Sequence, residues 1–390
     1  MFRAFKFRLF TDANQDRELA AMRETHRRLY NACLEERKAV YEAEERTVKY
    51  TEQSARFTAA RKTNPFYARI NFSSAQATMR RLDKSYQAFF RRAKEKKGKA
   101  GFPRFKSRDR FDSVEIPSYG DGIRLNGDRL RVQHVGVVKV KLHRPVDGVI
   151  KTVTLKDEAD RWYVVFSCEL PGVPIVPTDK PPVGIDVGLE SFLTTSDGAK
   201  EPNPRYLKDV LPELRRAGRS VSRKKKGGKN RRKAVKRLRK LHVRVKHLRK
   251  EHHHRVALKL VRRYGLIAAE GLNIEGMLKN GRLARSISDA GWSGFLLTLR
   301  CKAESAGIAY AEVGARGTSQ RCSGCGVEVR KDLAIRRHAC PHCGLSLDRD
   351  ENAAWNILAR GLQARIGLAG LNVGQQVKRA PRSRRLQATE

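Results

Sequence analysis

Two pairs of cysteines near the C-terminal end have the spacing of zinc ligands. Each pair is a Cys-x-x-Cys unit followed by a glycine, and the four candidate ligands are Cys322, Cys325, Cys340 and Cys343. Thiolates at this spacing wrap around one Zn²⁺ as a tetrahedron, and the glycine relieves the tight turn that follows. Four sulfur ligands leave no open coordination position, so the predicted zinc is structural rather than catalytic. His338 and His342 lie nearby in the sequence, and we expect them to be bystanders.

Three acidic residues lie where a folded domain would hold them in its interior. Asp186 stands within the apolar strand VGIDV, Glu270 ends the apolar strand LIAAE, and Asp350 opens the predicted helix DRDENAAWNIL. If that helix has begun by residue 350, Asp350 faces inward with the small residues at i+3 and i+4. Asp348 precedes the helix, where an aspartate commonly acts as a cap. An acid in an apolar strand is costly to bury without a partner. Asp186, Glu270 and Asp350 are therefore candidates for one shared site.

These acids could hold two Mg²⁺ or Mn²⁺ ions, because hard cations prefer carboxylate oxygens. Two such ions about 3.5–4 Å apart support phosphodiester cleavage by activating a water and stabilising the leaving oxygen. For each acid taken alone, a solvated or capping role is the simpler interpretation. The order Asp, Glu, Asp, with matching local contexts, favours the shared site.

The elements that must position these residues change in character along the chain. Residues 1–10 alternate apolar and basic side chains and predict a strand rather than a signal peptide, and residues 12–92 have helical spacing. Residues 113–172 have strand character, with a hairpin at 149–170, and could close a small barrel with the first strand. The proline-rich stretch 171–182 is the clearest linker. Apolar strands and helices alternate beyond it, up to a basic tail.

The net charge of +42, from 83 Lys and Arg against 41 Asp and Glu, indicates a polyanionic partner. About half of residues 223–255 are basic, and apolar residues recur there at helical spacing, which predicts an amphipathic helix with a cationic face that includes His252, His253 and His254. The stretch GFPRFKSRDRF at 101–111 suits either a nucleic-acid wall or a loop anchored to a core. The candidate nucleic-acid contacts are Arg104, Lys106, Arg108, Lys224, Lys225, Lys226, Arg231, Arg232, Lys236 and Arg239.

Other classes of protein are disfavoured by what the sequence lacks. No run of about 18 apolar residues is present, so no membrane span is expected. No G-x-x-x-x-G-K-[ST] loop is present, so ATP use is not expected. The odd total of 7 cysteines fits a reducing compartment and metal binding better than disulfides. Cys33, Cys168 and Cys301 are expected to be small core residues.

Several motifs together resemble the TnpB (OrfB-type) proteins of insertion sequences, which are compact RNA-guided DNA endonucleases related to type V CRISPR nucleases. The motifs are GFPRFK, RWYVVF, GIDVGLESFLTTSDG, AAEGLN, LARSISDAGW, TSQRCSGCG, CPHCG and LDRDENAAWNIL. The resemblance implies an α/β multidomain fold: an RNase H-like (RuvC) nuclease domain with an inserted zinc ribbon, preceded by a β-barrel wedge domain and a helical recognition lobe. It also implies that Asp186, Glu270 and Asp350 form the catalytic triad.

The expected domains follow from this resemblance and from the order of the elements. Residues 1–10 and 101–176 would form the wedge domain, and 11–100 the helical recognition domain. Residues 177–316, with a basic helix at 223–263, and 348–374 would form the nuclease domain around a zinc ribbon at 317–347. We expect the basic tail, 375–390, to be disordered. Arg249, Glu251 and His254 match a family motif only loosely, so no role is carried onto them.

The implied function is an RNA-guided, Mg²⁺-dependent endodeoxyribonuclease of a transposable element that cuts DNA beside a short flanking motif through a two-metal RuvC site. The implied partners are a guide RNA from the transposon end and target double-stranded DNA, with no membrane and no ATP. The implied location is the cytoplasm of a bacterium or archaeon, in association with the nucleoid. Two alternatives stay open: a catalytically silent RNA-guided DNA-binding regulator, and a transposase that transfers DNA strands.

Overall fold

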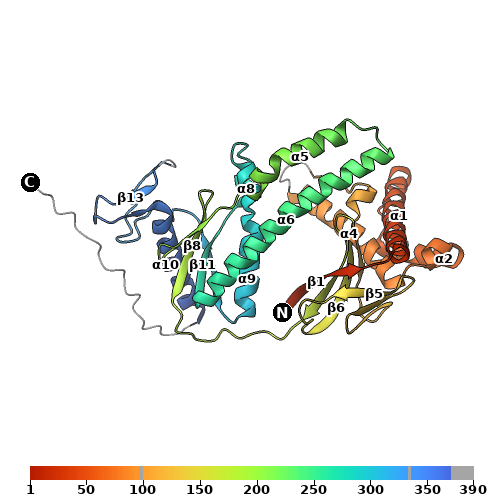
Figure 1. Cartoon of the computed structure of the whole chain (residues 1–390), viewed down its shortest axis with the longest axis horizontal. Helices are drawn as coiled ribbons and strands as arrows, with labels where there is room; N and C mark the ends of the chain where they lie inside the picture. Colours follow the sequence, from red (N-terminus) through yellow and green to blue (C-terminus); the bar gives the residue numbers. More distant parts are fainter. Residues whose placement is uncertain (96–99, 333–334, 370–390) are drawn as a thin grey trace, which may run out of the picture. The chain divides into compact units, whose positions relative to one another are not determined.

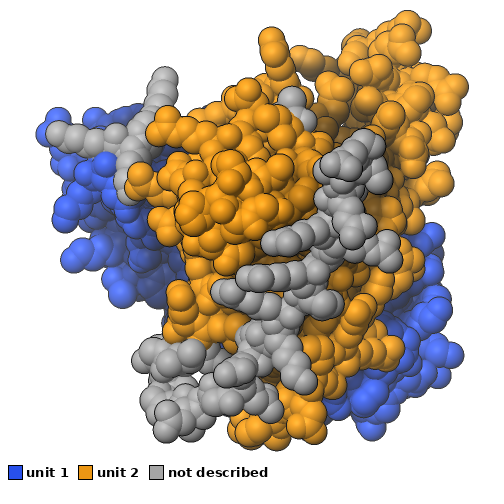
Figure 2. Space-filling view, turned by 90° about the vertical axis from the view of Figure 1, so that its left-hand side faces the viewer, with its two compact units in different colours: residues 1–172 blue, residues 173–390 orange. Residues whose placement is uncertain are grey.

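The computed structural model describes the backbone of residues 1–95, 100–332 and 335–369, with side chains up to residue 364. The chain divides into two compact units, residues 1–172 and 173–390, which Figure 2 distinguishes by colour. The tail at 375–390 that was expected to be disordered lies outside the described residues.

The first unit contains a seven-stranded antiparallel sheet in the order β2-β6-β7-β1-β5-β4-β3. Alternation of apolar and basic residues turns one face inward, where Phe5, Phe7 and Val138 join its core. The sheet is a half-barrel rather than the closed barrel that the sequence suggested, because its edge strands β2 and β3 pair only with β6 and β4 within the described residues. The strands are β1 (Phe2–Phe10), β2 (Ser113–Ile116), β3 (Ile123–Asn126), β4 (Arg129–Val132), β5 (Gly136–Lys141), β6 (Val149–Asp157) and β7 (Trp162–Glu169).

Helices occupy the stretch between β1 and β2, as the apolar spacing predicted. They are α1 (Ala13–Glu44), α2 (Tyr50–Thr63), α3 (Pro65–Ala68) and α4 (Phe72–Glu95), followed by a short 3₁₀ turn, η1 (Arg108–Arg110). Asp12 and Gln15 form a capping box that starts α1. Leu34, Met79 and Leu82 are fully buried in the cluster that these helices share.

The second unit is built on a five-stranded mixed sheet in the order β10-β9-β8-β11-β12. Strands β8, β11 and β12 are parallel, and β9 is antiparallel to both of its neighbours. Helices α6 and α9 pack on one face of the sheet and α10 on the other, so the parallel strands read as apolar runs (Figure 1). No helix in the described part of the chain could span a membrane.

The elements of the second unit alternate along the chain. They are β8 (Pro182–Val187), β9 (Ser191–Thr195), β10 (Lys200–Pro202), α5 (Tyr206–Ser222), α6 (Lys229–Arg263), β11 (Leu266–Gly271), α7 (Ile274–Met277), α8 (Ala284–Ala290), α9 (Trp292–Ser305), β12 (Ala309–Gly314), β13 (Arg337–Ala339), β14 (Ser346–Asp348) and α10 (Arg349–Ala369).

Candidate active site

The two strand acids lie side by side at the carboxyl edge of the central strands. In the parallel pairing of β8 with β11, Ile185 is opposite Ala269, and Asp186 and Glu270 are the next residue on each strand. Residues opposite each other in a parallel pair point to the same face of the sheet. Val183 and Ile185, which alternate with Gly184 and Asp186 along β8, face the other side of the sheet and pack into the core with α6 and α9.

Helix α10 brings the third acid to this edge, and two glycines set how closely the helix approaches. A Cβ on Gly184 would lie 2.0 Å from the Ala354 carbonyl oxygen, and one on Gly361 would lie 2.5 Å from the Ala268 Cβ. Gly184 is two residues before Asp186, so both point toward α10. The helix begins at Arg349, as its sequence predicted, and Asp350 lies in its first turn.

Burial raises the pKa values of all three carboxylates, and for Asp186 the charges of the other two acids add to this effect. Burial, followed by the charges of Glu270 and Asp350, raises the pKa of Asp186 well above its ordinary value. Burial also raises the pKa of Glu270, against the lowering effect of the Thr318 hydroxyl that donates a hydrogen bond to it. Burial and then Asp348 raise the pKa of Asp350. Within the described residues Asp186 has no hydrogen-bonded or ion-paired partner, so a bound cation would relieve the cluster.

Asp348, the other aspartate of the DRD motif, acts as a cap. Its Oδ1 accepts hydrogen bonds from the backbone N–H of Asp350 at 2.9 Å and of Glu351 at 3.4 Å. Its Oδ2 pairs with Lys200 Nζ at 2.7 Å. These contacts hold the pKa of Asp348 below its ordinary value. The capping role expected from the sequence is confirmed.

The four cysteines form a ready tetrahedral donor set. Their Sγ atoms all lie within 4.8 Å of one another, with 3.6 Å between Cys322 and Cys343 and between Cys325 and Cys340. A tetrahedron with Zn–S bonds of about 2.3 Å has S···S edges of about 3.8 Å, so this set fits zinc without rearrangement. In the described residues no other group of three or more His, Cys, Asp or Glu is as compact, and neither His338 nor His342 joins it. The carboxylate oxygens of the three acids therefore do not converge on one point.

The basic helix α6 packs its apolar stripe against α5 (Figure 1). Leu238 and Leu241 of α6 meet Val210 and Leu214 of α5, so the predicted amphipathic packing is confirmed. The turn between the helices is cationic: Lys224, Lys225, Lys229 and Arg231 line a hollow of about 540 Å³ there. Helices α5 and α6, with the turn between them, are called the α5–α6 arm. Contact of this arm with nucleic acid stays a prediction, and so does contact by its residues Lys226, Arg232, Lys236 and Arg239.

The histidines of α6 do not lie on a common cationic face. Of the three consecutive histidines, His252 and His253 are buried and His254 is exposed. Their rings pack against Phe192, and His253 Nε2 lies 2.9 Å from the Ala290 carbonyl oxygen. Burial lowers the pKa of both, so they are neutral core residues. The prediction that these histidines share the cationic face was wrong for His252 and His253. At this end of α6 they lie on the side of the helix that packs against the sheet and α9.

Residues 101–111 of the first unit are anchored to a core at one end, and contact of the remainder with nucleic acid stays a prediction. Phe111 is buried in the helical core, whereas Phe102 and Phe105 are 43% and 47% exposed. Lys38 Nζ lies 5.5 Å and 5.0 Å from the ring centroids of Phe102 and Phe105. Among the candidate contacts here, Arg104 is exposed, the Lys106 backbone bonds to Asn31, and Arg108 lies 3.5 Å from Glu24.

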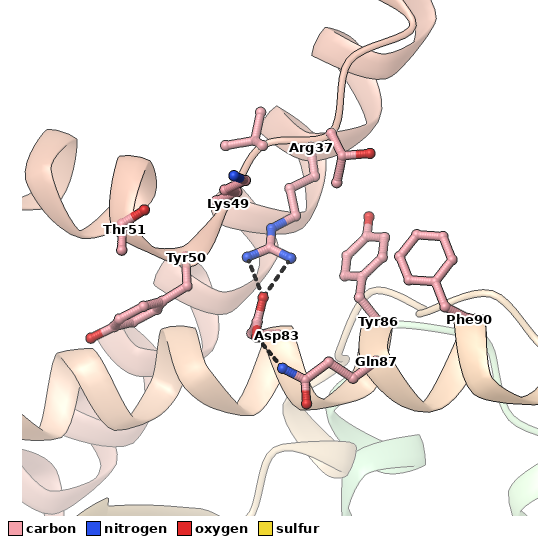
Figure 3. Close-up of a pocket in the computed structure, with 10 residues that line it drawn as sticks. Arg37, Lys49, Tyr50, Thr51, Asp83, Tyr86, Gln87 and Phe90 are labelled. Atoms are coloured by element: carbon pink, nitrogen blue, oxygen red, sulfur yellow. Dashed lines mark hydrogen bonds and ion pairs between the residues drawn. The ribbon is translucent and has the colours of Figure 1, made fainter.

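A hollow of about 320 Å³ between α1, α2 and α4 holds an ion pair rather than free donors. Figure 3 shows the Arg37 guanidinium directed at Asp83, whose second oxygen accepts from Gln87. The Arg37 Nε donates to Gln53 at 2.8 Å. The Arg37 guanidinium is therefore engaged within the protein.

Three residues that contact the acids or set the position of α10 were not singled out from the sequence. Thr318 bonds Glu270, Arg336 Nη1 lies 4.0 Å from Asp350 Oδ1, and Gly184 sets the approach of α10. A glycine two residues before an acid in an apolar strand is a usable signal of close packing. Cys301 corrects another prediction: it is exposed, because it falls on the outer face of α9, whereas Cys33 and Cys168 are buried.

Known proteins resemble this chain over nearly its whole length. A protein of Streptomyces pristinaespiralis named "Putative RNA-guided DNA endonuclease" is 33% identical over 388 residues, covering 98% of this chain and 94% of that protein. Residues 148–281 match the OrfB/IS605 family described as "Probable transposase", and 292–357 match a "Cas12f1-like, TNB domain". The chain belongs to the TnpB (OrfB-type) family.

Further matches extend this assignment. The Escherichia coli K12 protein "Putative RNA-guided DNA endonuclease InsQ" is 28% identical, covering 92% of each chain. Residues 1–46 match a family called "Helix-turn-helix domain", although here they hold strand β1 and the single helix α1. A solved structure titled "Structure of the mini-RNA-guided endonuclease CRISPR-Cas_phi3" covers 92% of each chain with a TM-score of 0.47 and 11% identity. At that score the likeness carries no weight of its own.

Proposed function

We propose that this TnpB-family chain is an RNA-guided DNA endonuclease that cuts beside a short flanking motif, with Asp186, Glu270 and Asp350 as its catalytic acids. The observation that carries the proposal is the meeting of these three acids, two from adjacent ends of parallel strands and one from the first turn of the helix packed on them. The names of the relatives support guided DNA cleavage. A mixed sheet of this strand order supports an RNase H-like (RuvC) domain.

The acids suit a pair of Mg²⁺ or Mn²⁺ ions better than a single ion. Their oxygens lie too far apart to share one point, and Asp186 has no partner of its own within the described residues. Bound between them, two such ions would activate a water and stabilise the leaving 3′ oxygen of DNA. The chain's own groups partly oppose the rise in pKa that burial causes: Thr318 donates a hydrogen bond to Glu270, and Arg336 and Lys200 act to lower the pKa of Asp350.

The cysteine ribbon would hold one structural Zn²⁺, and the cationic α5–α6 arm would contact phosphates. Lysines and arginines gathered at one turn release counterions when they meet a nucleic-acid backbone, so binding should weaken steeply as salt rises. We propose a guide RNA from the transposon end as the resident partner and double-stranded DNA as the target. Base pairing would then supply the sequence specificity.

The test is cleavage by the full chain purified with its own RNA. Wild-type protein should cut a plasmid that carries the matching target when Mg²⁺ is present. Asp186→Ala should lower the rate by about a thousandfold or more while RNA still co-purifies. Glu275→Ala, which removes an exposed acid of α7, should cut as the wild type does.

Each contrary result has a separate meaning. Full cleavage by Asp186→Ala overturns the catalytic assignment. Guided DNA binding by the wild-type protein without cleavage, in both Mg²⁺ and Mn²⁺, identifies a silent regulator. Strand-joined products identify a transposase.

A further inference from the structure

One line of polar residues along α10 faces the segment that leads into the zinc ribbon. Asn352, Asn356 and Arg360 recur every four residues and so lie along one side of the helix. We call these three residues the α10 ladder. Opposite them run residues 314–323, from the end of β12 to the first cysteine pair.

The first residue of the α10 ladder holds the zinc knuckle. Asn352 is fully buried, its Nδ2 donates to the Arg321 carbonyl oxygen at 2.8 Å, and its Oδ1 accepts from the Ser323 N–H at 2.9 Å. Arg321 and Ser323 flank Cys322 on either side. The backbone around one zinc ligand is therefore fixed to the helix that carries Asp350, two residues away from Asn352.

The other two residues of the α10 ladder hold the rest of the segment. Asn356 Nδ2 donates to the carbonyl oxygens of Thr318 at 2.8 Å and of Arg321 at 2.7 Å. Arg360 donates to the carbonyl oxygens of Gly314 at 2.5 Å and of Arg316 at 2.9 Å. Thr318 lies in the middle of this clamped backbone.

Thr318 completes the link to the acids. It is only 4% exposed, and its hydroxyl donates to Glu270 Oε1 and also lies 3.1 Å from the Ala315 carbonyl oxygen. Because its backbone is held, the Thr318 hydroxyl stays beside Glu270, and its hydrogen bond restricts the rotation of the carboxylate. The same clamp thus reaches two acids, Glu270 through Thr318 and Asp350 through α10.

We propose that residues 314–323 and the α10 ladder link the zinc ribbon to the nuclease acids, with Thr318 as a positioning residue for Glu270. The inference deepens the proposed function and rests on it. Partners that orient a metal-binding carboxylate commonly change metal affinity or activity by about 10–100-fold when removed. Zinc in the ribbon therefore supports divalent-ion binding at the acids, although the four sulfurs never contact that site.

The first test compares Thr318→Val with Thr318→Ser in the full chain purified with its RNA. Valine keeps the shape without the hydroxyl, and serine keeps the hydroxyl. Mn²⁺ binding at the acids is measured by electron paramagnetic resonance, with Asp186→Ala as the baseline, and zinc content is measured in parallel. Thr318→Val should weaken Mn²⁺ binding about tenfold or more at unchanged zinc content, and Thr318→Ser should restore it. Equal Mn²⁺ binding by Thr318→Val and the wild type overturns the positioning role.

The second test asks whether the ribbon and the acids are linked. Asn352→Ala should release zinc to a chelator about tenfold faster and should also weaken Mn²⁺ binding. Gln363→Ala, at an exposed position of α10, should change neither. Faster zinc release with unaltered Mn²⁺ binding overturns the link. If the wild type binds Mn²⁺ at the acids yet cuts no DNA, the proposed function fails while the link still stands.

Discussion

The two units of the chain differ in whether their buried charged side chains have partners. In the first unit, Arg37 is only 5% exposed, and Asp83 and Gln53 accept its hydrogen bonds. His26 is fully buried there between the hydroxyls of Thr78 and Ser74. In the second unit, three acids are gathered at one sheet edge, and Asp186 has no partner within the described residues.

This difference separates charge that serves stability from charge that serves chemistry. A buried charge with matched partners holds helices together, and removing one partner is costly. Acids gathered at a largely buried edge are costly to ionise, which makes the fold less stable until a cation binds them. The second unit accepts that cost at the edge where we propose that DNA is cut.

Of the effects that this contrast predicts, the largest change in stability should come from removing the partner of a buried charge. Asp83→Ala leaves the Arg37 guanidinium buried without its carboxylate, so the free energy of unfolding should fall by about 3 kcal/mol. Urea unfolding measures the loss, and hydrogen–deuterium exchange should place it in α1 and α4. Glu304→Ala, which breaks the exposed Arg300–Glu304 pair, should cause no measurable change. Equal effects of the two substitutions would remove the contrast.

A smaller effect should follow from acidification through His26. Burial lowers the pKa of His26 to about 3, whereas an unfolded histidine has a pKa of about 6.5. The unfolded chain therefore binds the extra proton between these values, and stability is lost as the pH falls from about 6.5 toward 3. Between pH 7.5 and 5 this single group should cost about 2 kcal/mol. The slope should be shallower in His26→Gln, and identical slopes would show that His26 has the same pKa in the folded and the unfolded chain.

The smallest effect should come from relieving the unpaired cluster. Asp186→Asn removes one of the like charges, so without divalent cations the stability at pH 7 should rise by about 1 kcal/mol. Saturating Mn²⁺ should stabilise the wild type but not the variant. Thermal unfolding with and without Mn²⁺ measures both effects. A destabilised Asp186→Asn protein would mean that an unseen cationic partner already balances the acid.

Local features of both units followed directly from residue type and spacing. The cysteine pairs, the hairpin at 149–170, the inward face at Asp350 and the capping role of Asp348 each depend on neighbours close in the sequence. Such patterns are visible in a sequence because helix and strand periods fix which side chains share a face. The apolar stripe of α6 was predicted for the same reason.

Features that depend on distant segments were not predictable in this way. The burial of His252 and His253 depends on α9 and Phe192, and the exposure of Cys301 depends on which side of α9 meets the sheet. The open half-barrel depends on where β2 and β3 come to lie. The bond from Thr318 to Glu270 joins residues 48 positions apart. No local period encodes contacts of this kind.

The narrow gap between β8 and α10 has a consequence for surveys of related genes. A copy encoding Gly184→Ala would keep every acid and every cysteine, yet its new methyl group would press on the Ala354 carbonyl oxygen and displace the helix that bears Asp350. A survey that counts intact acids alone would class such a copy as functional. Gly184 therefore belongs among the positions used to separate working genes from decayed ones.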